Sequence, residues 1–126
     1  MKKITKTTKE KVDDIIIDAG GKTLGRVAGE IAHILMGKNK VSFERNVYSG
    51  SPVKVINASK IRITPAKLEN ISHNRYSGYP GGLRVTKAKE TVEKKGFKEL
   101  IRLSVHHMLP GNKLRREMLK NLKIEE

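Results

Sequence analysis

The residues best suited to chemistry lie in one segment, 75–84, where arginines, tyrosines and glycines are interleaved. Arg75 and Arg84 can bind phosphates, and Tyr76 and Tyr79 can stack on unpaired bases or pack against ribose. The glycines between them allow a backbone to approach closely. An ordinary turn-rich loop with both tyrosines folded beneath it is the alternative. We favour RNA contact because the chain has a net charge of +14.

Two other patterns suggest chemistry but lack the partners that it needs. The four histidines, at positions 33, 73, 106 and 107, form no H-x-x-x-H pair and have no cysteine beside them, so we expect no metal site. Asp18 follows the first predicted strand, where α/β enzymes often keep catalytic groups, but no His or Ser partner is placed with it. We interpret Asp18 as a turn-capping residue and expect no catalytic residues.

Glycines at positions 20, 21 and 25 raise the question of nucleotide binding. A phosphate-binding P-loop ending in Gly-Lys-Thr at position 23 would need its first glycine at position 16, where the chain has Ile16. The three glycines also fail the G-x-G-x-x-G spacing of dinucleotide-binding turns. We therefore interpret Gly20 and Gly21 as turn residues and expect neither a cofactor nor a small-molecule substrate.

The composition favours a polyanionic partner. The chain has 126 residues, with 27 Lys and Arg against 13 Asp and Glu, and its pI is near 10.2. Such an excess of positive charge is typical of proteins that bind nucleic acid. The chain has no cysteine, no recognisable signal peptide and no apolar run long enough to span a bilayer. We expect a cytoplasmic protein with no membrane role.

The length predicts one domain, preceded by an arm. Residues 1–14 are rich in Lys and Thr and too poor in large apolar residues to pack a core, so we expect a flexible basic arm. This arm either remains solvated or orders against RNA. Residues 15–126 form the predicted domain.

A strand, a glycine turn and a helix between residues 15 and 39 form the predicted centre of the fold. Ile15 to Ile17 is a β-branched run, as expected of a strand buried on both faces. From Leu24 onward the apolar residues recur with the spacing of one helix face. Thr23 can cap this helix, and Gly37 can end it in the left-handed conformation.

A second stripe of the same helix consists of small residues. Gly25, Gly29 and Ala32 lie three or four positions apart, so a neighbouring backbone, of the protein or of a ligand, could approach closely. Glycine inside a helix costs about 1 kcal/mol relative to alanine. We interpret the stripe as a surface of close packing.

The middle of the chain predicts a crossover followed by a loop. The apolar residues of Val53 to Ile56 predict a second strand. The order strand, helix, strand indicates a parallel crossover. Residues 72–84 show no periodicity, so we expect a long loop, and long loops in small domains often carry function.

Helical spacing returns after this loop. The first helical stretch spans 85–95, with Thr86 as its cap and Gly96 as its stop, and a more strongly amphipathic helix follows it. Asn112 can cap a last helix, whose apolar residues lie four apart up to Leu122. Helices that cover a small sheet indicate an α/β domain.

Five short motifs occur in a distinctive order: DAGGKTLGR at 18–26, GK at 37–38, VINA at 55–58, YPGGL at 79–83 and HMLP at 107–110. In order and spacing they resemble the ribosomal protein L13 family of the large subunit, in its bacterial form, over about residues 15–122. The chain departs from the family at Pro65 and His107, where the family has glycine. It also has no tryptophan before the first strand and ends before the family's usual tyrosine and tail.

This resemblance implies an α/β fold in a single domain, with a small, mainly parallel sheet and helices on both faces. It also implies a structural constituent of the large ribosomal subunit in the cytoplasm, with no enzymatic activity. Such a protein would bind 23S-type rRNA, support subunit assembly in translation and contact neighbouring large-subunit ribosomal proteins.

We expect the rRNA contacts to come from basic side chains over much of the chain and from two tyrosines: Lys22, Arg26, Lys38, Lys40, Arg45, Lys60, Lys67, Arg75, Tyr76, Tyr79, Arg84, Lys113, Arg115 and Arg116. Two other classes compete with this interpretation. A nucleotide-using enzyme would need an intact phosphate loop or a catalytic constellation. An RNA-independent interaction domain predicts binding that barely responds to nucleic acid or salt.

Overall fold

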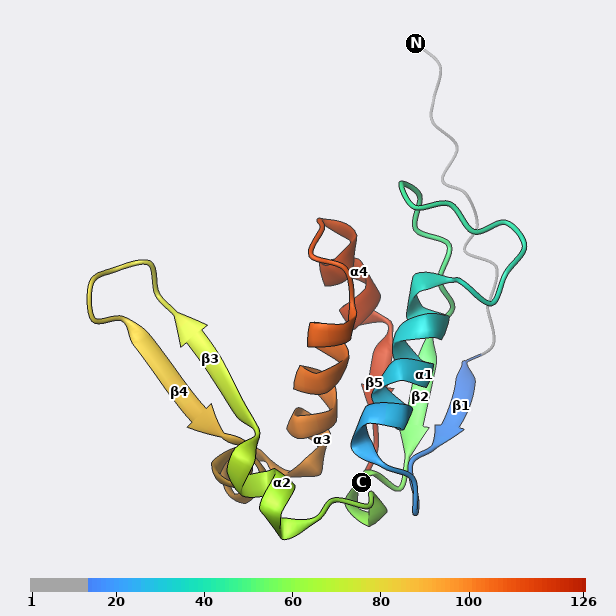
Figure 1. Cartoon of the computed structure of the whole chain (residues 1–126). Helices are drawn as coiled ribbons and strands as arrows, with labels where there is room; N and C mark the ends of the chain where they lie inside the picture. Colours follow the sequence, from blue (N-terminus) through green and yellow to red (C-terminus); the bar gives the residue numbers. More distant parts are fainter. Residues whose placement is uncertain (1–13) are drawn as a thin grey trace.

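A three-stranded parallel sheet is the centre of the fold (Figure 1). In this computed structural model, which describes residues 14–126, the strands are β1 (Ile15–Asp18), β2 (Val53–Ile56) and β5 (Leu122–Ile124), in the order β1-β2-β5. The expected parallel crossover from β1 to β2 is confirmed, as is the α/β class. The predicted arm lies outside the described residues, except for Asp14.

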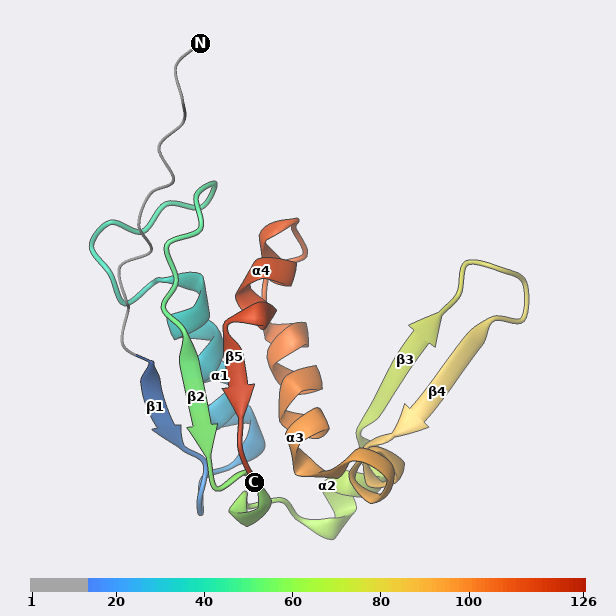
Figure 2. The same cartoon turned by 180° about the vertical axis from the view of Figure 1, so that it is seen from behind.

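Only one face of this sheet is covered by the described helices. Ile17 aligns with Val55, and Val55 with Ile124, and all three are buried. Ile16 points the opposite way and is 64% exposed, so the expected burial of the first strand on both faces is wrong. Seen from behind, the strands lie in front of α1 (Leu24–Met36), and α3 (Ala88–Met108) lies beside α1 (Figure 2).

The strand order explains why the helices do not cover both faces, as the family resemblance had implied. The order β1-β2-β5 runs in one direction across the sheet. Right-handed crossovers made in one direction place their connecting helices on the same face. Within residues 14–126, the opposite face instead carries Ile16, Lys54 and Lys123, which align with one another.

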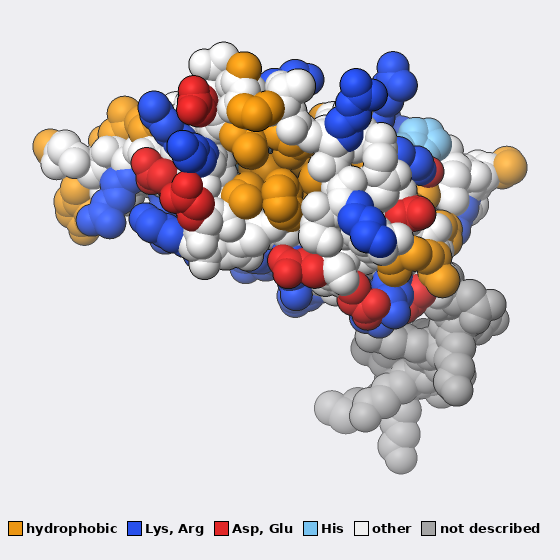
Figure 3. Space-filling view, turned by 90° about the horizontal axis from the view of Figure 1, so that it is seen from below, with side chains coloured by type: hydrophobic (Ala, Val, Ile, Leu, Met, Phe, Trp, Pro, Cys, Tyr) orange, Lys and Arg blue, Asp and Glu red, His pale blue; other side chains and the backbone are white. Residues whose placement is uncertain are grey.

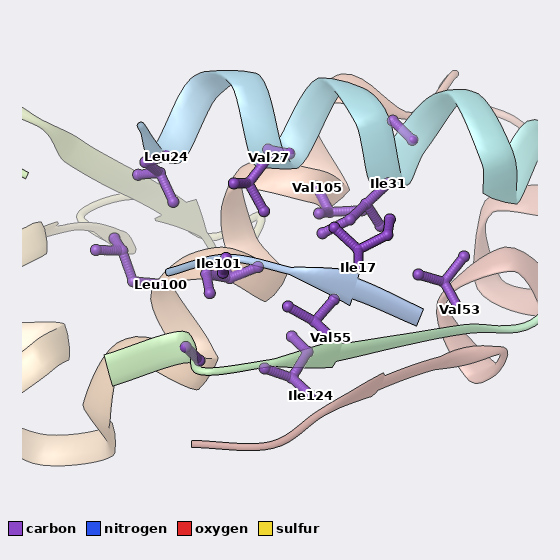
Figure 4. Packing of buried hydrophobic residues seen from close by; sticks show 14 of the residues in the cluster. Ile17, Leu24, Val27, Ile31, Val53, Val55, Leu100, Ile101, Val105 and Ile124 are labelled. Atoms are coloured by element: carbon purple, nitrogen blue, oxygen red, sulfur yellow. The ribbon is translucent and has the colours of Figure 1, made fainter. Parts of the chain in front are cut away.

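Helix α1 packs on the covered face as its spacing predicts. Its predicted apolar stripe is buried throughout: Leu24, Val27, Ala28, Ile31 and Leu35. Figure 4 shows side chains of this stripe meeting those of the strands and of α3 in one cluster. Gly37 ends the helix with φ 82°, as expected, whereas Thr23 occupies the N-cap position without a side-chain hydrogen bond.

The small-residue stripe of α1 is only partly a packing surface. Ala32 is buried, and a Cβ added to Gly29 would lie 3.9 Å from the Met108 sulfur, an ordinary contact. At Gly25, however, an added Cβ would meet nothing within 4 Å. The expected close packing is therefore wrong for Gly25, because this turn of the helix faces a hollow.

A β-hairpin stands where the sequence predicts a long loop. A short 3-10 helix, η1 (Ala58–Lys60), and α2 (Pro65–Asn70) lead into β3 (Ser72–Tyr76), which pairs antiparallel with β4 (Leu83–Lys87). Only residues 77–82 connect the strands. The hairpin projects from the rest of the molecule (Figure 1). β3 lacks the apolar alternation by which half-buried strands are recognised, and in β4 this alternation is limited to Leu83 and Val85, both of them exposed.

The helices that follow differ from expectation mainly at their ends. β4 extends to Lys87, so Thr86 lies in a strand and α3 begins at Ala88. Gly96 interrupts α3 with φ 80° and ψ 178°, where the sequence predicts a stop. The second half of α3 then buries three apolar side chains against α1: Leu100, Ile101 and Val105.

The last helix is shorter than expected. α4 spans Leu114–Lys120, and the Asn112 side-chain oxygen accepts hydrogen bonds from the backbone N–H groups of Leu114 and Arg115, at 3.1 and 3.2 Å. This confirms the predicted cap. Leu122 does not continue the helix but begins β5, because its segment pairs with β2.

Candidate RNA-binding surface

The β3–β4 hairpin has two chemically different faces. Arg75 pairs directly with Arg84 across the strands, and Tyr76 pairs with Leu83. Since neighbouring side chains of a strand point to opposite faces, both arginines lie on one face and the Tyr76–Leu83 pair lies on the other. Like charges placed directly opposite destabilise a hairpin. The arginine face is therefore arranged to accept an anion.

The arginine pair borders a hollow at the tip of the hairpin. This hollow measures about 320 Å³ and is also lined by Ser77, Gly81 and Gly82. A Cβ at Gly82 would overlap the Ser77 hydroxyl, so the tight turn requires glycine there. Two guanidinium groups beside small residues can hold a phosphate at close range.

Both tyrosines of the hairpin face solvent. Tyr76 is 64% and Tyr79 is 76% exposed. The alternative of tyrosines folded beneath a loop is therefore wrong. Exposed aromatic rings beside arginines suit the stacking of unpaired bases.

A second hollow lies between the hairpin and α3, and we call it the hairpin cleft. It measures about 630 Å³ and is lined by His73, Asn74, Arg75, Thr86, Thr91, Lys94, Lys95, Glu99, Leu103, His106 and His107. Glu99 is its one acidic lining residue, and its carboxylate lies 3.6 Å from the Arg102 guanidinium. Lys94 and Lys95 join Arg75 here although they are not among the predicted contacts, because no local sequence pattern brings them beside the hairpin.

Two histidines stack at the base of the hairpin. The His73 and His107 ring centroids are 5.4 Å apart, and His107 Nδ1 lies 2.7 Å from the Leu103 carbonyl oxygen. Burial, and next the neighbouring His107, lower the pKa of His73. Burial, and next Arg115, lower the pKa of His106. Within residues 14–126, no group of three or more His, Asp or Glu side chains is arranged to hold a metal ion.

A third hollow follows α4 and continues the positive surface. It measures about 730 Å³ and brings together three predicted contacts with one further lysine: Lys113, Arg115, Arg116 and Lys120. His106 lines both this hollow and the hairpin cleft, so the two are adjacent. We call the tip hollow, the hairpin cleft and the α4 hollow together the hairpin–α4 surface.

Two predicted contacts already have partners within the protein. Lys22 forms an ion pair with Glu30, at 3.3 Å. The Lys40 ammonium donates a hydrogen bond to the Ser49 carbonyl oxygen, at 2.9 Å. Because both ammonium groups already have partners, they are poorer candidates for RNA contact than the hairpin arginines.

The other predicted cations do not line the three hollows of the hairpin–α4 surface, although two of the hollows that they line border it. Lys38 and Arg45 line a hollow of about 530 Å³ beside α4. Lys67 lines an apolar hollow together with Arg62. Arg26 and Lys60 are exposed elsewhere. Seen from below, Lys and Arg side chains are spread over the molecule, with hydrophobic side chains gathered near the centre (Figure 3).

Asp18 has the turn role expected of it. Its Oδ1 accepts hydrogen bonds from the Gly20 backbone N–H, at 2.9 Å, and from the Asn57 side-chain amide, at 3.0 Å. The Asn57 bond and then the Gly20 bond hold the pKa of Asp18 below its ordinary value. The carboxylate therefore ties the turn after β1 to the end of β2.

The family model for ribosomal protein L13 matches residues 13–125. The chain belongs to this family. The large ribosomal subunit protein uL13 of Aquifex aeolicus is 50% identical over 109 residues, which cover 86% of this chain and 75% of the relative. The uL13 protein of Syntrophotalea carbinolica is 43% identical over 121 residues, covering 96% and 84%. In the described residues, no helix is long and apolar enough to cross a membrane.

Proposed function

We propose that this chain binds the rRNA of the large ribosomal subunit through its hairpin–α4 surface. Membership of the L13 family makes the chain a structural constituent of that subunit, which is cytoplasmic in bacteria, and not an enzyme. Large-subunit rRNA and neighbouring ribosomal proteins are therefore its partners. The proposal concerns which side chains meet the RNA.

The direct pairing of Arg75 with Arg84 carries this assignment. A two-stranded hairpin is marginally stable on its own, and an unrelieved like-charge pair weakens it further. A phosphate between the guanidinium groups turns that repulsion into two charge-assisted hydrogen-bonded contacts. The hairpin is therefore more stable when it is bound to a polyanion than when it is free.

The rest of the surface extends this anion site along α3 and α4. Lys94 and Lys95 line the hairpin cleft, and Arg115 and Arg116 line the adjacent α4 hollow. Cations in successive hollows suit the repeating phosphates of a nucleic-acid backbone. Phosphate contacts position a protein on RNA, and the exposed tyrosines can add stacking on unpaired bases.

The test is filter binding of the full chain to large-subunit rRNA over a series of salt concentrations. If about six phosphates are neutralised, the logarithm of affinity should fall with the logarithm of salt at a slope of about 4 to 5, taking roughly 0.7 to 0.9 per phosphate. A slope near zero would favour an RNA-independent interaction domain and overturn the proposal.

A further inference from the structure

An apolar hollow at the start of α1 borders the hairpin cleft, with which it shares His73 and His107, and we call it the α1 hollow. It measures about 490 Å³ and lies between α1, α2, β3 and α3, and its lining includes Leu24, Gly25, Arg62, Lys67 and Met108. We propose that it receives the base of one unpaired rRNA nucleotide. This inference rests on the proposed function and adds a specific subsite to it.

Gly25 is the first reason to expect an occupant. Glycine in a helix is less favourable than alanine, so it needs a compensating reason. Neither backbone conformation nor internal packing supplies one, because Gly25 has no positive φ and an added Cβ would meet nothing within 4 Å. A glycine that no contact within the described chain requires leaves the helix backbone open to a flat ligand.

The walls of the α1 hollow suit a planar ring. Leu24, Ile63 and Ile71 offer apolar side chains, and Met108 adds a polarizable sulfur that is favourable beside aromatic rings. His107, stacked on His73, adds an imidazole to the same wall. The volume of the hollow falls within the range of about 300 to 1,000 Å³ found for small-ligand sites.

The charges around the α1 hollow select a nucleotide over an apolar protein side chain. Arg62 and Lys67 line it, and no carboxylate does. The Arg62 backbone N–H donates to the Lys22 carbonyl oxygen, at 2.9 Å, which holds the backbone of Arg62 beside the start of α1. A nucleotide provides a ring for the apolar walls and a phosphate for the cations, whereas a leucine or phenylalanine leaves both cations unpaired.

The test fills the hollow without removing a charge. Gly25→Leu places a good helix former where the structure has open space. His33→Leu is the matched control, because His33 is an exposed residue of the same helix outside the hollow. Full-chain variants at pH 7.5 are compared by thermal melting, by affinity for large-subunit rRNA and by chemical probing of each base in the complex.

We expect Gly25→Leu to melt no lower than the parent and to bind rRNA about 5- to 150-fold more weakly, the range associated with one stacked base. One base that is protected in the parent complex should become reactive in the Gly25→Leu complex. His33→Leu should match the parent in both affinity and base protection. Unchanged affinity and protection in Gly25→Leu would overturn the inference, although a steep salt dependence of the parent would still support the proposed function.

Two further outcomes also decide the question. If Gly25→Leu binds rRNA normally but fails to enter assembled subunits, a neighbouring protein fills the α1 hollow and the nucleotide is wrong. If Gly25→Leu unfolds, Gly25→Ala is compared with Gly29→Ala, which makes the same change one turn along α1. A loss of affinity and base protection confined to Gly25→Ala would support the inference, and equal behaviour of the two variants would refute it.

Discussion

Replacing both hairpin arginines should weaken RNA binding without weakening the fold. Arg75 and Arg84 face each other across β3 and β4 and border the tip hollow. If each contacts one phosphate, the double variant Arg75→Ala, Arg84→Ala releases two fewer counterions. The salt slope should then fall by about 1.4 to 1.8, at roughly 0.7 to 0.9 per phosphate.

The stability of the double variant should equal or slightly exceed that of the parent. No ion pair in residues 14–126 involves either arginine, and directly opposed like charges are unfavourable. The free energy of unfolding from urea melts should therefore stay within about 0.5 kcal/mol of the parent or rise. A loss of binding could then not be attributed to unfolding.

A matched control separates local contact from total charge. Lys54→Ala with Lys123→Ala removes the same formal charge from the sheet face opposite the helices. Both lysines have carboxylate partners, Glu125 at 2.9 Å and Asp14 at 3.1 Å. Filter binding to large-subunit rRNA should show a larger drop in slope for the arginine pair. Equal effects of the two pairs, or the parent's slope in the arginine variant, would refute the assignment of the hairpin.

Three further predictions concern the fold. Leu35 is fully buried on α1, so Leu35→Ala should lower the free energy of unfolding by about 2 to 5 kcal/mol in urea melts; a loss below about 0.5 kcal/mol would contradict this packing. Gly96 has φ 80° and ψ 178°, so Gly96→Ala should cost about 1 to 3 kcal/mol in the same assay, and an unchanged midpoint would count against the kink. Burial lowers the pKa values of His73 and His106 in the folded protein from the ordinary value of 6.5. The free energy of unfolding should therefore be highest above pH 6.5 and decline as the pH falls from there through the lowered pKa values of the folded state. His73→Gln should reduce the difference between urea midpoints at pH 8 and pH 5, and an undiminished difference would exclude His73 as a source.

The elements that the sequence predicted well are those whose signal is local. α1 carries a complete apolar period and a glycine in the left-handed conformation at its end, so both its buried face and its terminus followed from spacing. The hairpin carried only a weak signal, because β3 is polar except for Tyr76 and the apolar alternation of β4 is limited to Leu83 and Val85. β5 has only three residues, and it pairs with β2, which is distant from it in the sequence. Hydrophobic periodicity cannot predict such a long-range pairing.

The candidate site could be predicted only in part, because local sequence signals identify its arginines but not the contacts between distant segments. Arg75 and Arg84 were recognisable from their local setting, but their direct opposition depends on strand register. Lys94 and Lys95 became candidates only because the hairpin folds back beside α3. Spacing alone assigned Gly25 to a packed surface, since a small-residue stripe does not show whether a neighbour is present.

The most direct test of the central claim is site-specific photo-cross-linking in assembled large subunits. A photo-reactive residue replaces Tyr79 at the hairpin tip in one variant and Ile16 on the opposite face of the sheet in another. Both positions are exposed in the protein alone. We predict cross-links to rRNA from position 79 and none from position 16. Cross-links to rRNA from position 16 together with none from position 79 would contradict the account.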